Sequence, residues 1–244
     1  MASAAGTTAK QEEQPLPISD DDLPLLYEDE EEGEMGEANI HVLTEEIFRN
    51  GLKAHLGPQR RYCVFSNMNL YYHPKDPKAY VSPDTMLVEP LRELGEDVSS
   101  YRIGVDGPAP KLTLEVLSAR TAQQRDLEEK VIVYAKLGVQ EYILVDVTGE
   151  YLPQRLLLKR LQPNGTWRDE QDPDGGVTSQ LGFRLIIDTD GHLRMLNAAT
   201  GERYARPDEA ETEAEARRQA EERIRVLEAE LRRLRGTTSP AENP

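Results

Sequence analysis

The sequence is poor in cysteine and in long apolar runs. Its one cysteine, Cys63, excludes an intramolecular disulfide and any metal site built from several cysteines. No stretch approaches the roughly 20 apolar residues that a membrane-spanning helix needs, and the first ten residues lack the apolar core of a signal peptide. We therefore expect a cytoplasmic protein that has no membrane partner.

Basic residues are missing from one part of the chain. Residues 11–37 contain twelve Asp or Glu and no Lys or Arg, whereas the rest of the 244 residues carry 33 acids against 29 bases. The net charge of -16 therefore argues against a polyanionic partner only for this segment. Composition predicts an acidic, partly disordered segment at 1–36, one domain at 37–206, a helix at 207–235 and a disordered tail at 236–244.

The first half of the predicted domain contains one helix and several strands. Apolar residues recur at mostly helical spacing between Glu37 and Leu56, a pattern that leaves Thr44, Glu45, Glu46 and Arg49 on the solvent side. Aromatic and β-branched residues then predict adjacent, antiparallel strands at 61–66, 69–72 and 80–88. The following segment, 90–110, is rich in Gly, Pro and Ser and predicts a long connection.

The second half indicates a strand, helix, strand unit. The apolar run 112–117 predicts a buried strand, the pattern at 122–137 predicts a helix that ends at Gly138, and 142–146 predicts another buried strand. This order implies at least one parallel pair of strands. With further strands expected at 155–161, 166–169 and 184–188, the fold class is mixed α/β, with a central mixed sheet flanked by helices and a C-terminal helix.

The C-terminal helix carries a short heptad pattern. Its apolar residues fall at spacings of four and three: Ala220, Ile224, Leu227, Leu231 and Leu234. We expect a coiled coil, either in a homodimer or with a partner helix. The alternative is a solvated helix that packs on its own domain, because about two heptads make a short seam.

Three charged residues stand where the fold predicts apolar ones. Asp84 follows Pro83 in a predicted strand, Glu115 interrupts the apolar run 112–117, and Lys130 falls within the apolar arc of the predicted helix. A buried carboxylate costs several kcal/mol unless it is paired, protonated or bound to a metal. Lys130 can point at Glu115, extend to the rim of the helix, or form an exposed pair with Asp126.

Two carboxylates and a lysine at one edge of a sheet can serve a metal-dependent hydrolase. Mg²⁺ is typically held by one or two carboxylates together with substrate phosphates, so Asp84 and Glu115 are sufficient protein ligands. The ammonium of Lys130 would then stabilise a phosphate or position a water. We expect Mg²⁺ as the cofactor, with Mn²⁺ as a second choice.

The motifs in their order along the chain resemble those of the Uma-two family of endonucleases, which belongs to the restriction-endonuclease-like PD-(D/E)xK superfamily. The resemblance covers roughly residues 20 to 200, and its ordered series is more specific than any one motif. The matching residues are Pro83-Asp84, Leu114-Glu115-Val116-Leu117-Ser118, Thr121, Asp126, Lys130, Tyr134, Gly138-Val139-Gln140-Glu141-Tyr142 and Asp146, preceded by Met35-Gly36-Glu37 and His41.

The resemblance implies a restriction-endonuclease-like core with a metal-dependent nuclease site. In that interpretation Asp84 and Glu115 bind the metal and Glu37 adds a third acid. The alternative for Glu37 is an ordinary acidic first turn that favours the helix dipole. The superfamily signature has a lysine two residues after the second acid, where this chain has Leu117. The resemblance to the Uma-two family implies that the lysine lies on the following helix, where Lys130 is the matching residue. Lys111, in phase with Glu115 at the head of the same strand, is the alternative.

Two functional hypotheses follow. The first is a metal-dependent endonuclease that hydrolyses DNA phosphodiester bonds, with Asp84, Glu115 and Lys130 as catalytic residues. The second is a non-catalytic scaffold or binding protein that retains the nuclease fold. The lack of a large basic patch favours the scaffold, since phosphate contacts supply much of DNA affinity. A dimer could instead combine two copies of the basic group Lys53, Arg60 and Arg61.

Overall fold

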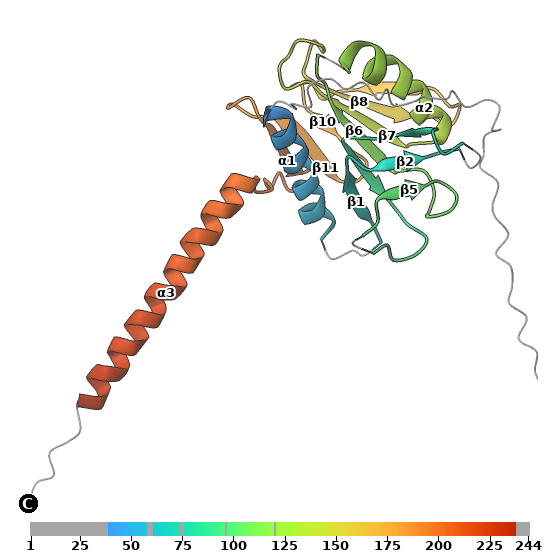
Figure 1. The fold of residues 1–244 in the computed structure, drawn as a ribbon. Helices are drawn as coiled ribbons and strands as arrows, with labels where there is room; N and C mark the ends of the chain where they lie inside the picture. The colour runs from blue at the N-terminus through green and yellow to red at the C-terminus, as the bar shows by residue number, and fades with distance from the viewer. Residues whose placement is uncertain (1–38, 58–60, 74–75, 96, 120, 238–244) are drawn as a thin grey trace, which may run out of the picture. The chain divides into compact units, whose positions relative to one another are not determined.

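The computed structural model describes residues 39–57, 61–73, 76–95, 97–119 and 121–237, except for the side chains of 123–124 and 234–237 (Figure 1). The described chain divides into two compact units between Tyr204 and Ala205. The first unit contains the sheets and the candidate site, and the second is built on one helix. The predictions made for residues 1–36 and 238–244 lie outside the described residues.

Over its described residues, the first unit is organised around a six-stranded sheet. Its strands, in spatial order, are β1 (Cys63–Ser66), β4 (Thr85–Val88), β6 (Leu112–Val116), β7 (Glu141–Val145), β8 (Leu156–Leu161) and β9 (Trp167–Glu170). β6 and β7 are parallel, and the other neighbours are antiparallel. The crossover between β6 and β7 is helical: η2 (Ala122–Glu129) continues directly into α2 (Lys130–Leu137). The predicted strand, helix, strand unit and the predicted mixed α/β fold are therefore confirmed.

The two faces of the central strands support separate cores. Leu114 and Val116 of β6 belong to the apolar cluster that includes residues of α1 (Asn39–Leu56). Side chains alternate along a strand, so Glu115 points to the opposite face, where Val133 and Tyr134 of α2 are buried. Because of this alternation, the side chain of Glu115 lies on the face of the sheet that α2 covers.

Two smaller sheets complete the described part of the first unit, each with three strands. One has the order β3 (Tyr80–Val81), β2 (Asn69–Tyr71) and β5 (Ser100–Arg102), and the other has β10 (Val177–Thr178), β11 (Phe183–Ile187) and β12 (Leu193–Asn197). The sequence analysis missed β5, β10 and β12. Two of these strands are only two or three residues long, and β5 lies in the segment that was predicted to be a connection.

The strand predicted at 80–88 is divided in two. β3 ends at Val81 and β4 begins at Thr85, and the two belong to different sheets. Pro83 lies at the break, where its missing N–H cannot contribute to a ladder. β1 and β2 also lie in different sheets, so the predicted strands do not form one set. The predicted antiparallel pairing is confirmed, because β1 pairs with β4 and β2 pairs with β3. Asp84 lies at the junction as a result.

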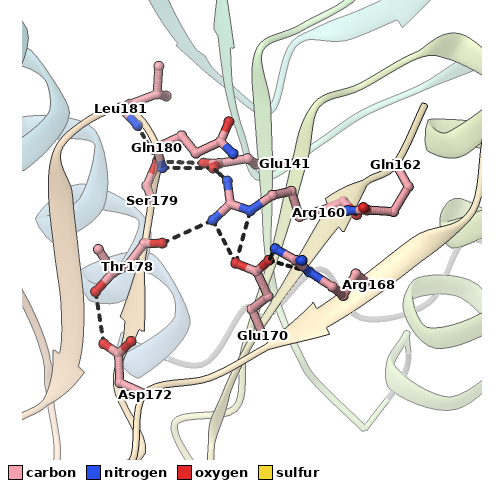
Figure 2. A network of polar contacts seen from close by, with 10 residues as sticks. All are labelled: Glu141, Arg160, Gln162, Arg168, Glu170, Asp172, Thr178, Ser179, Gln180 and Leu181. Carbon is pink, nitrogen blue, oxygen red and sulfur yellow. Dashed lines mark hydrogen bonds and ion pairs between the residues drawn. The ribbon is translucent and has the colours of Figure 1, made fainter.

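A buried ionic network joins the main sheet to the β10–β12 sheet (Figure 2). Arg160 of β8 pairs with Glu141 of β7 and with Glu170 of β9, and its guanidinium also donates to the Thr178 carbonyl of β10 at 3.2 Å. Ser179 donates its hydroxyl proton to Glu141. Because these charges are extensively hydrogen-bonded, we assign the network to holding the two sheets together.

The second unit contains α3 (Pro207–Thr237). Its first turn has Pro207 at the favoured first position, and the backbone N–H of Arg206 donates to the Glu209 carboxylate at 2.9 Å. The side chains described from Glu209 onward are almost all exposed. Neither α3 nor any other described helix combines the length and the apolar composition that crossing a bilayer would require.

Candidate functional site

Glu115 is the centre of a buried polar cluster between β6 and α2. Its side chain is 1% exposed. The ammonium Nζ of Lys130 lies 2.8 Å from Oε2, and the Tyr134 hydroxyl donates to Oε1 at 2.7 Å. Lys130 and Tyr134 are four residues apart on α2, so they share one helix face. The structure therefore brings Lys130 to Glu115 and not to the rim of the helix, since its side chain is only 5% exposed.

Asp126 closes the other side of Lys130. Its Oδ1 lies 3.0 Å from Lys130 Nζ, and its side chain is 2% exposed. The alternative of an exposed Asp126–Lys130 pair is therefore wrong, although the pair itself forms. The segment η2 is π-helical: the Asp126 N–H donates to the Thr121 carbonyl, and the Lys130 N–H donates to that of Arg125. Such wider turns often occur at functional sites.

Asp84 approaches the same cluster from the junction of two sheets. The backbone N–H of Val116 donates to its Oδ2 at 2.6 Å, and its own backbone N–H lies 3.4 Å from Oε2 of Glu115. The side chain of Asp84 is 16% exposed, which makes it more accessible than the buried Glu115. Asp84, Glu115 and Lys130 thus lie together, as the sequence analysis expected.

α1 adds a histidine and a glutamate to this site. His41 Nε2 lies 3.0 Å from Glu45 Oε1 and 3.4 Å from Asp84 Oδ2. One donor atom from each of the three residues lies within 4.8 Å of the others, an arrangement that could hold a metal ion. Asn67 fixes Glu45 by donating from Nδ2 to Oε2 at 2.9 Å, from a backbone with a φ of 51°.

The burial of Glu45 corrects the sequence analysis, which assigned Thr44 and Glu45 to the solvent side. Both are buried. The apolar stripe was defined without Phe48, which is fully buried and is one turn beyond both residues. His41, Glu45 and Phe48 follow the helical spacing of i, i+4 and i+7, so this phase was a signal that could have identified Glu45.

The remaining candidates are located elsewhere. Glu37 lies outside the described residues, so its role as a third acid stays a prediction. Lys111 Nζ lies 3.8 Å from Oε2 of Glu89, and both side chains are 25% exposed, so Lys111 belongs to a surface pair. Arg61, from the predicted basic group, also pairs with Glu89.

Burial and charge together perturb the pKa values of the cluster. Burial raises the pKa of Glu115 well above its ordinary value, although Lys130 opposes the shift. Burial also raises the pKa of Asp126. For Lys130, burial lowers the pKa, but the negative charges of Glu115, Asp126 and Asp84 outweigh it and the net direction is upward. The ammonium is therefore charged at neutral pH.

His41 is also held in its charged form. Burial opposes that form, but hydrogen bonds to Asp84 and Glu45 outweigh it and raise the pKa of His41 to about 10. Among the described residues, the two cationic groups Lys130 and His41 thus face the carboxyl groups of Glu115, Asp126, Asp84 and Glu45. This excess of carboxyl groups is an environment that favours a proton or a cation.

Comparisons with known proteins identify the family. The model of the family Uma2, described as "Putative restriction endonuclease", matches residues 30–188, which confirms the resemblance inferred from the motifs. A crystal structure of a putative nuclease belonging to DUF820 from Anabaena variabilis ATCC 29413 is 20% identical, with a TM-score of 0.45. That similarity covers 59% of this chain and 73% of the other. No curated protein matches the chain.

Proposed function

Because the chain belongs to the Uma2 family, we propose that it is a metal-dependent endonuclease that hydrolyses DNA phosphodiester bonds. The observation that carries the proposal is the buried contact of Lys130 with Glu115 beside Asp84. A buried pair of an acid and an amine usually stabilises a fold less than two apolar residues of similar volume, because both charges must be desolvated. Such a cost is expected where the groups serve chemistry.

The carboxylates fit a divalent cation. Asp84 and Glu45 belong to the cluster that could hold an ion, and Glu115, beside Asp84, would add a further oxygen ligand of the kind that Mg²⁺ and Mn²⁺ prefer. Glu37, on the family pattern, remains a proposed third acid. The excess of carboxyl groups over cationic groups supports this assignment, because a divalent cation would neutralise it. His41 would have to release its proton before its imidazole could join Asp84 and Glu45 as a ligand, and an imidazole suits ions such as Zn²⁺.

The residues of the site divide the work between binding and charge stabilisation. A bound divalent cation would supply positive charge to the scissile phosphate and lower the pKa of a water. Lys130 would stabilise the negative charge that develops on the phosphate oxygens. Tyr134 orients Glu115 through its hydroxyl, and the Val116 N–H orients Asp84. These fixed contacts favour preorganisation of the site.

A second candidate is a non-catalytic scaffold that retains the fold. The observation in its favour is that Lys130 is 5% exposed and is already paired with two carboxylates, so the cluster can serve as a structural network. Arg61, from the basic group proposed for DNA, is likewise paired with Glu89. A scaffold would bind no metal at Asp84 and would leave DNA intact.

Plasmid cleavage by the full chain tests the proposal. Supercoiled DNA with Mg²⁺ or Mn²⁺ should be nicked, and Glu115→Gln and Lys130→Met should each lower the rate by about 100- to 1,000-fold. Lys111→Met is the matched control, because Lys111 belongs to the surface pair with Glu89, and it should keep the wild-type rate. Equal losses in Lys111→Met and Lys130→Met would remove the special role of Lys130.

Metal binding is measured separately from cleavage. The thermal midpoint of the wild type should rise with Mg²⁺ or Mn²⁺ at concentrations above the dissociation constant, and that of Asp84→Asn should rise less. If no metal supports cleavage by the wild type and none raises its thermal midpoint, the scaffold is the better account.

We also assign the protein to the cytoplasm, since one cysteine allows no internal disulfide.

A further inference from the structure

α3 presents an apolar stripe that its own unit leaves exposed. Ile224, Leu227 and Leu231 are 56%, 50% and 52% exposed. Their spacing of three and four residues is that of a and d positions in a heptad, and Ala220 extends the same phase by four residues. A single helix gains most of its stability by packing an apolar face, so this stripe calls for a partner.

We propose that a second copy of this chain covers the stripe, in a parallel and in-register coiled coil of two α3 helices. The charges beside the stripe select this partner and this direction. With Ile224 at a and Leu227 at d, Arg223 occupies a g position and Glu228 an e position. Residues g and e are the positions that form ion pairs between the helices of a coiled coil.

A parallel pair places opposite charges together. The g residue of one helix faces the e residue of the next heptad on its partner, so Arg223 faces the partner's Glu228, and the two-fold axis repeats the contact. Both side chains are exposed. Glu228 also lies 3.6 Å from Arg232 of its own helix, and this ion pair competes with the contact between helices. The pair within the helix is weak because both side chains are exposed.

An antiparallel pair places some like charges together. In that arrangement e residues face e residues, and g residues face g residues. With Ile224 opposite the partner's Leu227, Glu228 faces the partner's Glu221, which repels it, and Arg223 faces the partner's Glu230, which attracts it. In the next register Glu228 faces the partner's Glu228. Attraction in the antiparallel arrangement is thus offset by repulsion between carboxylates, whereas the parallel contact of Arg223 with Glu228 only attracts. The sequence of α3 therefore discriminates between the two directions by charge.

Parallel pairing has a consequence for the first unit. The amino-terminal ends of the two helices meet, and each follows directly from the unit that carries Asp84, Glu115 and Lys130. Both copies of the candidate site are thus tethered to the same end of one coiled coil. The association itself holds whether or not the site is catalytic, and it is measured without DNA or metal.

Sedimentation of the full chain tests the interface. At concentrations of about 100 μM the wild type should have twice the mass of one 27.5 kDa chain. The variant Leu227→Lys with Leu231→Lys should be monomeric, with its dissociation constant raised by about 100-fold or more. Val226→Lys is the matched control, because Val226 is 50% exposed but lies off the stripe, and it should remain dimeric. A monomeric wild type, or a dimeric double variant, overturns the proposal.

Charge exchange tests the contact. Arg223→Glu and Glu228→Arg should each weaken the dimer by about tenfold, and the two changes together should restore it. Failure of the double change to restore association contradicts a contact between Arg223 and Glu228.

A disulfide tests the direction. In a parallel pair, Ala220→Cys faces its own copy and should cross-link on oxidation. In an antiparallel pair, at least 11 residues, or about 16 Å along the helix, separate the two positions, beyond the roughly 7 Å limit for a disulfide. The wild type, whose one thiol is the partly buried Cys63, is the control and should not cross-link. A dimer of Ala220→Cys that does not cross-link contradicts the parallel direction.

Discussion

Replacing Lys130 by Met should lower the free energy of unfolding by about 3–5 kcal/mol at pH 7, because it leaves two buried carboxylates without their counter-charge. The ammonium lies 2.8 Å from Glu115 and 3.0 Å from Asp126. Methionine has nearly the same length and is apolar, so the change removes the charge with little change in volume. The loss is therefore electrostatic and not a cavity effect.

The magnitude follows from two limits. At an effective dielectric constant of 20, each contact of Lys130 with a carboxylate contributes about 6 kcal/mol of attraction, most of which offsets the desolvation of the three groups. Once the ammonium is gone, a buried carboxyl can become neutral by taking up a proton. For a group with an unfolded pKa near 4.3, that protonation costs about 4 kcal/mol at pH 7. This cost limits the loss for each carboxyl.

The same limit gives the pH dependence. Burial raises the pKa values of Glu115 and Asp126 above their unfolded values, so the folded state gains protons and becomes relatively more stable as the pH falls. At pH 5 the cost of protonation drops to about 1 kcal/mol for each carboxyl. The deficit of Lys130→Met relative to the wild type should therefore shrink between pH 7 and pH 5.

Trp167 provides the assay. It is the one tryptophan of the chain, and its indole N–H donates to the Val131 carbonyl of α2 at 2.8 Å, so its fluorescence reports on α2 directly. Urea melts at pH 5 and pH 7 should be compared for the wild type, Lys130→Met and the surface control Lys111→Met. The control should lose less than about 1 kcal/mol. A deficit of Lys130→Met that is no larger than the control's, or that grows toward pH 5, refutes the reasoning.

Three further predictions concern the neighbouring contacts. Because the pKa of His41 is raised to about 10, the stability that its charge contributes is fully present below about pH 6.5 and is lost as the pH rises toward 10. Urea melts over this range should therefore show the wild type losing stability relative to His41→Gln. Both Asn67→Ala and Asn67→Gly lose the hydrogen bond to Glu45, but only glycine accepts the positive φ without strain. Asn67→Ala should therefore melt at a lower temperature than Asn67→Gly, by the equivalent of about 1 kcal/mol. Asp146 accepts hydrogen bonds from the backbone N–H groups of the turn that follows it, so Asp146→Ala should cost about 2–3 kcal/mol in a urea melt, with a smaller loss for Asp146→Asn.

The buried lysine was predictable because local periodicity determines it. A helix of the correct phase and a strand with one interrupting carboxylate face each other whenever a tight crossover joins them, so Lys130 and Glu115 could be paired from the sequence. Their roles in catalysis remain proposals. The third partner, Asp126, was placed beside Lys130 at the spacing of i and i+4, but its burial was missed, because a pair of this spacing can equally lie on an exposed helix face.

Long-range pairing set the limit of the sequence analysis. Asp84 was assigned to the interior of one strand, but β3 and β4 join different sheets, a choice that depends on residues distant in sequence. The same holds for β5, whose three residues are fixed by pairing with β2. The burial of Glu45 depends only on local helical spacing and could have been predicted. With Phe48 included in the apolar stripe, Glu45 falls on the same buried face of α1 as Phe48 and His41.

The π-helical turns of η2 make the chain unusually sensitive to a change in its length. Glu128 is exposed and lies between Asp126 and Lys130, so its side chain tolerates substitution. Deletion of that residue is different: it would shorten the separation of Asp126 and Lys130 from four residues to three and remove a residue from the wider turns of η2. Natural variants of this segment should therefore differ by substitution and keep the spacing. In an alignment of homologues, a gap at this point would mark chains that have lost the extra residue of these wider turns.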